Sequence, residues 1–132
     1  MVRTSAHTLL LTYGPHEVIN NARQLRVADG NIVPSVPVLF SNLSAYVRFE
    51  YEGHGDVRVG LRILDPSGKE LLRNEGNIAV PADRRVEVAN FTSIPLRVEQ
   101  AGDYRAELLI DGVIVTHYTF PVAVDVSGPV AN

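Results

Sequence analysis

Residues 104–119 read YRAELLIDGVIVTHYT, and this stretch decides the fold. Asp111-Gly112 lies between two runs of apolar and β-branched residues, which is the strongest short signal for a hairpin because a type I′ turn needs positive φ at both central residues. The turn predicts four facing pairs: Ile110 with Val113, Leu108 with Val115, Ala106 with His117, and Tyr104 with Thr119. This alternation predicts one apolar and one polar face, as in a half-buried antiparallel pair.

The composition predicts one domain, since the chain has 132 residues, of which 45% are hydrophobic and none is cysteine. A chain of this length buries a core without disulfides, so we expect one domain over residues 1–124 and a flexible C-terminal tail over residues 125–132. The net charge of -3 argues against nucleic acid or a membrane surface as the partner. The apolar run Leu9-Leu10-Leu11 is too short for a signal peptide or a spanning helix, so we expect a cytoplasmic protein.

Two consecutive stretches, residues 45–52 and 57–64, show the clearest alternation of a strand. The side chains predicted to face inward are Ala45, Val47, Phe49, Tyr51, Val57, Val59, Leu61 and Ile63. The outer faces carry opposite charges, so we expect the two strands to be cross-strand neighbours, with Glu50 and Glu52 against Arg58 and Arg62.

The N-terminal third is less regular. Residues 8–13 predict a first strand, and Asp29-Gly30 predicts a tight turn between short strands. Residues 16–24 fit either a loop or a single helical turn.

No stretch has the period of an amphipathic helix, and about eight short strands are joined by glycine, proline and asparagine turns. Among these turns, Asp65-Pro66-Ser67-Gly68 has the residue that each turn position favours. We therefore predict an all-β fold, an antiparallel two-sheet β-sandwich of immunoglobulin or fibronectin III kind with about seven to nine strands. Gly102-x-Tyr104-x-Ala106 has the spacing of a tyrosine corner, with Ala106 where disulfide-bearing domains have a cysteine.

Three segments resemble a bacterial family of small uncharacterised proteins: DGNIVPSVP at residues 29–37, LDPSGKE at 64–70 and GDYRAELLIDG at 102–112. The resemblance covers about residues 8–124 and implies a single immunoglobulin-like sandwich. Because the family has no known function, the resemblance assigns no functional residue.

The residues themselves carry no catalytic or metal-binding motif. The histidines His7, His16, His54 and His117 are isolated, without the spacing that places two metal ligands on one face. There is no nucleophile elbow and no phosphate-binding glycine loop. We therefore expect no enzyme, with no catalytic, cofactor-binding or metal-ligating residue and no cofactor.

Three apolar or aromatic residues interrupt the polar face of the last hairpin and form the candidate interaction face: Leu109, Ile114 and Tyr118. Exposed apolar groups mark an interface when they are contiguous. We expect a non-enzymatic interaction or assembly module whose partner is another protein or a second copy of itself, which would give a homo-oligomer. The alternative is a module that binds a small molecule or carbohydrate through the loops at one end, using His54, Asp56, Arg84 and Arg85.

Overall fold

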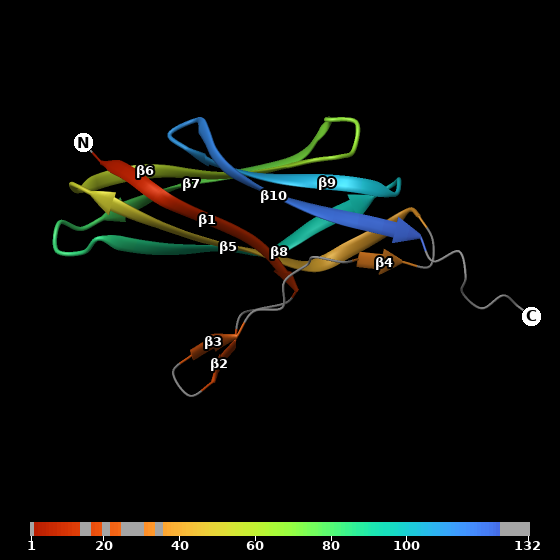
Figure 1. The fold of residues 1–132 in the computed structure, drawn as a ribbon, viewed down its shortest axis with the longest axis horizontal. Helices are drawn as coiled ribbons and strands as arrows, with labels where there is room; N and C mark the ends of the chain where they lie inside the picture. The colour runs from red at the N-terminus through yellow and green to blue at the C-terminus, as the bar shows by residue number, and fades with distance from the viewer. Residues whose placement is uncertain (1, 14–16, 20–21, 25–30, 34–35, 125–132) are drawn as a thin grey trace, which may run out of the picture.

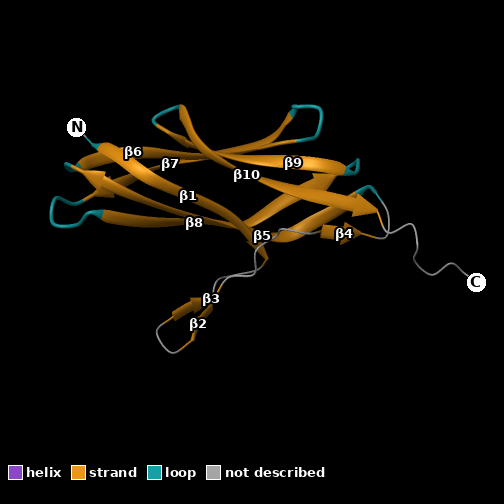
Figure 2. Cartoon of the chain, viewed as in Figure 1, coloured by secondary structure: helices purple, strands orange, loops and turns teal. Residues whose placement is uncertain are grey.

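The computed structural model describes residues 2–13, 17–19, 22–24, 31–33 and 36–124, and these residues form ten strands and no helix (Figure 2). The strands are β1 (Arg3–Tyr13), β2 (Glu17–Ile19), β3 (Ala22–Gln24), β4 (Asn31–Val33), β5 (Val38–Glu52), β6 (Gly55–Leu64), β7 (Glu70–Val80), β8 (Val86–Val98), β9 (Gly102–Ile110) and β10 (Val113–Val124). Over the described residues, therefore, no helix is available to cross a membrane. The predicted all-β class is confirmed.

Two sheets form the sandwich, with strand orders β1-β5-β8 and β4-β10-β9-β6-β7 (Figure 1). In the immunoglobulin arrangement, β1, β5 and β8 occupy positions A, B and E of one sheet. β10, β9, β6 and β7 occupy positions G, F, C and C′ of the other. The predicted immunoglobulin-like sandwich is confirmed. One pairing departs from the antiparallel expectation, because β4 runs parallel to β10.

The core lies between the two sheets and contains the predicted inward rows. The four apolar side chains from β5 and the four from β6 have at most 2% of their surface exposed. The period of two in each strand sends alternate side chains into the core, so the inward rows follow directly from the sequence.

β5 and β6 belong to different sheets, so the expected cross-strand pairing of their outer faces is wrong. The chain crosses between the sheets at Gly53, whose φ of 94° is available to glycine at little cost. The inward rows then face each other across the core, and Glu50 and Glu52 lie on the opposite outer face from Arg58 and Arg62.

The β9–β10 hairpin keeps the predicted turn but loses the predicted register. Asp111 and Gly112 have φ of 50° and 82°, and Val113 pairs with Ile110 as expected. A bulge between Ile114 and Thr116 then inserts one residue into β10. The facing pairs beyond it are Leu108 with Thr116, Glu107 with His117, Ala106 with Tyr118, and Tyr104 with Phe120. A one-residue shift exchanges the two faces of a strand, so His117 is exposed rather than packed opposite Ala106.

The N-terminal region also differs from the expectation. The first strand begins at Arg3, and residues 17–19 and 22–24 pair as a small antiparallel hairpin instead of forming a loop or a helical turn. The predicted turn at Asp29-Gly30 and the predicted tail at residues 125–132 lie outside the described residues.

The predicted tyrosine corner is present at the start of β9. The Tyr104 hydroxyl donates a hydrogen bond of 2.7 Å to the backbone oxygen of Gln100, and its ring stacks on Phe120 with centroids 5.7 Å apart. Gly102, with φ of 136°, packs on Pro66, because a Cβ built at residue 102 would lie 2.8 Å from the Pro66 Cγ. The β6–β7 turn and the β8–β9 connection are thereby held together at one end of the sandwich.

Candidate interaction surfaces

The three residues of the predicted interaction face do not lie on one face of the sheet. Ile114 points outward with 45% of its surface exposed, and Leu109 is paired with it but only 4% exposed. Tyr118 packs partly buried against the core, because the bulge turns it to the inner side of the sheet. Of these three residues, only Ile114 is therefore exposed.

Leu109 is buried by a glycine and a long acidic side chain from the neighbouring strands. The outer face carries a cross-strand row of Ile114, Leu109, Gly60 and Glu75. A Cβ built on Gly60 would lie 3.1 Å from the Glu75 Cγ and 3.5 Å from the Leu109 Cβ. The absence of a side chain at Gly60 therefore lets the Glu75 methylenes lie across the sheet beside Leu109.

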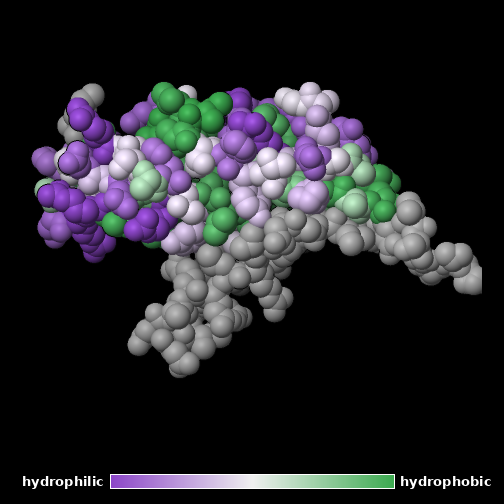
Figure 3. Space-filling view, in the orientation of Figure 1, coloured by the Kyte–Doolittle hydropathy of each residue, from purple (hydrophilic) through white to green (hydrophobic). Residues whose placement is uncertain are grey.

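The tip of the β9–β10 hairpin is the most exposed apolar feature near the predicted face. Val113 is 63% exposed and lies beside Ile114, and the hairpin appears as a green patch in the space-filling view (Figure 3). The turn is fixed to β6 by two hydrogen bonds, from the Asp111 amide to the Arg58 oxygen at 2.8 Å and from the Arg58 amide to the Asp111 Oδ1 at 3.0 Å. The tip, defined as Val113 and Ile114, is therefore an apolar projection on a constrained turn. The sequence did not predict the exposure of Val113. Its partner Ile110 is buried, and cross-strand pairing alone predicts the same burial for both residues.

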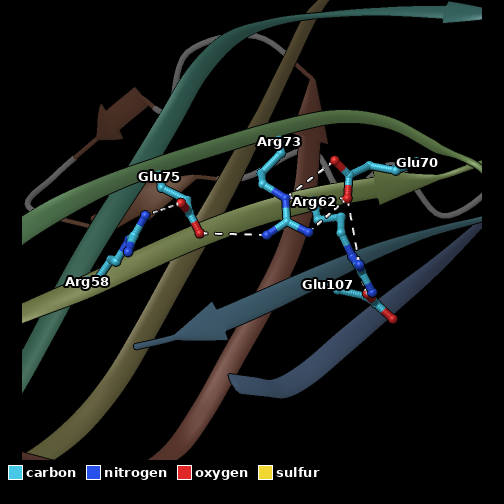
Figure 4. Close-up of polar contacts among 6 residues, drawn as sticks. All are labelled: Arg58, Arg62, Glu70, Arg73, Glu75 and Glu107. Carbon is cyan, nitrogen blue, oxygen red and sulfur yellow. Dashed lines mark hydrogen bonds and ion pairs between the residues drawn. The ribbon is translucent and has the colours of Figure 1, made fainter. Parts of the chain in front are cut away.

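Beside the tip, the outer face of the five-stranded sheet carries an ion-pair chain of alternating arginine and glutamate side chains (Figure 4). Its members, in contact order, are Arg58, Glu75, Arg73, Glu70, Arg62, Glu107 and Arg105. Each glutamate contacts two arginines, and both ends of the chain are arginines with one acidic partner each. The side chains come from β6, β7 and β9, which the sheet order places side by side.

The closest contacts of the chain are charge-assisted hydrogen bonds. The Arg58 Nη2 lies 2.7 Å from the Glu75 Oε1, the Arg62 Nε lies 2.7 Å from the Glu107 Oε1, and the Arg73 Nη2 lies 2.9 Å from the Glu70 Oε1. The bond from Arg73 lowers the pKa of Glu70 and raises that of Arg73. The Glu70 carboxylate is therefore held in its ionised form between Arg73 and Arg62.

The residues of the alternative small-molecule site lie on two loops at the end of the sandwich opposite the tyrosine corner. His54 and Asp56 lie at the β5–β6 connection and Arg84 and Arg85 at the β7–β8 loop, and all four are exposed. Tyr51 joins the end of β5 to the β7–β8 loop, since its amide donates to the Arg85 oxygen at 2.8 Å and its hydroxyl to the Pro81 oxygen at 2.7 Å. The four predicted side chains therefore share one end of the fold.

The histidines of the described chain are separate from one another. His7 is partly buried, and its Nε2 lies 2.7 Å from the Thr4 hydroxyl; burial lowers the pKa of this imidazole. Within the described residues, no three histidine or acidic side chains gather as metal ligands, and His16 lies outside these residues.

A groove of about 420 Å³ lies between the ends of β7 and β8, on the opposite end from His54. Its apolar lining comes from Leu71, Leu72 and Leu96, and its charged lining includes Asp65 and Lys69. The sequence did not predict this groove, because it arises where the edges of two different sheets diverge.

One family model matches most of the chain. A family model described as a family of unknown function (DUF6941) matches residues 28–123. No curated protein matches the sequence.

Two of the similar solved structures are glycosidases. The β-D-glucoside glucohydrolase from Trichoderma reesei is 15% identical with a TM-score of 0.54, covering 93% of this chain and 19% of the enzyme. The β-glucosidase from Listeria innocua, in complex with isofagomine, is 10% identical with a TM-score of 0.50, covering 89% of this chain and 16% of the enzyme. An immunoglobulin-like protein (PA1606) from Pseudomonas aeruginosa is 14% identical with a TM-score of 0.44, covering 92% and 96% of the two chains. The chain thus spans less than a fifth of either glycosidase, and the likeness to these two enzymes concerns the fold alone.

Proposed function

The chain belongs to DUF6941, a family of unknown function, and we propose that it is a non-enzymatic immunoglobulin-like module that binds another protein or a second copy of itself. The hairpin tip, Val113 and Ile114, is the contact. The neighbouring ion-pair chain forms the charged border of this contact.

The exposure of the tip carries this proposal. Val113 and Ile114 are consecutive, β-branched and exposed, on a turn that is hydrogen-bonded to the neighbouring strand. A rigid apolar projection loses little conformational entropy on binding, and burying the surface that these two side chains still expose contributes about 1–2 kcal/mol each. The polar and charged residues beside it match the polar rim that surrounds the apolar centre of an interface.

The test replaces both tip residues with glutamate, as Val113→Glu with Ile114→Glu. The matched control is Val86→Glu with Val88→Glu, which changes two equally β-branched residues, 37% and 41% exposed, on the other sheet. Self-association is measured by sedimentation equilibrium, and partner capture by a tagged pull-down from lysate of the native organism followed by mass spectrometry.

We expect the tip variant to lose the associated species while the control retains it. Circular dichroism and the unfolding midpoint verify that both variants are folded. Equal association by wild type, tip variant and control would refute the assignment of the contact to the hairpin tip. Leu109 is unsuitable for this test, because a charge at a buried position affects folding before it affects binding.

A further inference from the structure

We infer that β1 is an exchangeable strand, which leaves its place on β5 of its own chain and fills the same place on β5 of a second copy. The partner is an identical chain, and the exchange gives a symmetric dimer in which each core contains the N-terminal strand of the other chain. This contact shares no residue with the hairpin tip and is independent of the function proposed above. The sheet order, the connection after β1 and the shape of its site each support it.

β1 and β4 belong to different sheets (Figure 1). β1 pairs with β5 at the edge of the three-stranded sheet, whereas β4 pairs with the end of β10 in the five-stranded sheet. Among the described residues, β5 is the only strand with which β1 forms a ladder. Release of β1 therefore breaks one ladder and leaves β4 in place on β10.

A long connection, residues 14–30, joins these two strands. Even with the β2–β3 hairpin kept folded, residues 14–16 and 25–30 can span about 30 Å at about 3.3 Å per residue. The family model begins at residue 28, so β4 lies within the matched part of the chain and β1 lies before it. β1 is thus tethered to the matched domain by a connection long enough to reach a neighbouring copy.

The place of β1 on β5 needs an apolar strand to complete the core. Leu9 and Leu11 face Val47 and Ala45 of β5, and both leucines have at most 4% of their surface exposed. Without them the inner row of β5 would be exposed to water at this edge of the sandwich. The site is therefore stable only when a β1 strand fills it, from its own chain or from another.

A local irregularity restricts which strand fits this site. The ladder shifts register between Ser5 and Thr8, and Ala6 within this bulge has φ of 50°. At the same point the His7 Nε2 lies 2.7 Å from the Thr4 hydroxyl. The β1 strand of a second copy reproduces the bulge and both buried leucines in full. A second copy is therefore the partner that fits.

Exchange keeps every contact between β1 and β5, so protein concentration decides between the two arrangements. A strand on a tether of this kind has an effective concentration on the order of 1 mM at its own site. The β1 strand of a second copy therefore competes when the protein concentration is of the same order.

The test is an engineered disulfide between β1 and β5, in a chain that has no native cysteine. Thr8 and Arg48 face each other across the two strands, and such residues lie about 4.5–5.5 Å apart at Cα, within the range of a disulfide. The variant is Thr8→Cys with Arg48→Cys. The matched control is Asp56→Cys with Ala79→Cys, an exposed facing pair in β6 and β7 that the exchange leaves within one chain.

Each full-length variant is unfolded in urea with a reductant, refolded at protein concentrations on the order of 10 µM and of 1 mM, and then oxidised. Circular dichroism verifies that the refolded variants are native. Non-reducing denaturing electrophoresis then separates the two products. A disulfide within one chain gives a monomer, and a disulfide between exchanged strands gives a covalent dimer.

We expect the covalent dimer of the β1–β5 variant to rise from about 2% of the protein at the lower concentration to about half at the higher one. The control stays monomeric at both concentrations. Adding Val113→Glu and Ile114→Glu leaves the dimer fraction unchanged, which separates the exchange from the contact at the hairpin tip. A β1–β5 variant that stays monomeric at both concentrations would overturn the inference. Equal dimer formation by the control, or loss of the dimer with the tip changes, would overturn it as well.

Discussion

Leu109 and Ile114 face each other across β9 and β10, and truncating each to alanine is expected to have unequal effects on stability. Leu109 has 4% of its surface exposed and Ile114 has 45%. Full burial of such a side chain contributes about 1.5–3 kcal/mol, and the cavity left in a packed site adds to the cost of truncation. The cost of Leu109→Ala is about 2–3 kcal/mol, near the low end for a buried leucine, because the Glu75 methylenes can partly fill the space. The cost of Ile114→Ala is about 1 kcal/mol, since about half of its surface is already in water.

Urea unfolding followed by circular dichroism measures both free energies. With a slope of about 1–2 kcal/mol/M for a domain of this size, Leu109→Ala lowers the midpoint by about 1–3 M and Ile114→Ala by about 0.5–1 M. A native domain is stable by about 5–15 kcal/mol, so both variants remain folded in water. If Leu109→Ala lowers the free energy of unfolding no more than Ile114→Ala does, the packing of Leu109 beside Gly60 and Glu75 does not stabilise the fold, and the reasoning is refuted.

Further predictions concern the turns and the ion-pair chain. Tyr104→Phe removes the tyrosine-corner hydrogen bond and is expected to cost about 1 kcal/mol in thermal or urea unfolding. Gly102→Ala is expected to cost about 1–3 kcal/mol from backbone strain, and combining it with Pro66→Ala recovers only the steric part. The bond from the Ser67 hydroxyl is the main cause of the lowered pKa of Asp65, so the contribution of that carboxylate to stability is complete above its unfolded pKa of about 4 and is lost as pH falls toward its folded value. Asp65→Asn should therefore flatten the loss of stability below about pH 4, and an unchanged profile contradicts this. Glu107→Gln leaves two arginines short of a partner and is expected to cost about 1–3 kcal/mol, with a smaller cost at high salt.

The features that could be predicted from the sequence are those that neighbouring residues determine. Alternation in β5 and β6 is a property of each strand by itself, so the inward rows were predicted correctly. The turns are equally local: Asp111-Gly112 has the expected positive φ, and Gly68, with φ of 90°, donates its amide to the Asp65 oxygen at 2.9 Å. The tyrosine corner spans four residues and was also predicted correctly.

The errors arose where distant segments determine the structure. The sheet to which a strand belongs depends on all of its neighbours, so the opposite charges of β5 and β6 predicted a pairing that the fold does not contain. The bulge after Ile114 exchanged the faces of β10 and removed Tyr118 from the predicted interaction face. The burial of Leu109 depends on Glu75, which is more than thirty residues away in the sequence. The available signal was Gly60, since a glycine inside a strand often marks close approach of another chain segment.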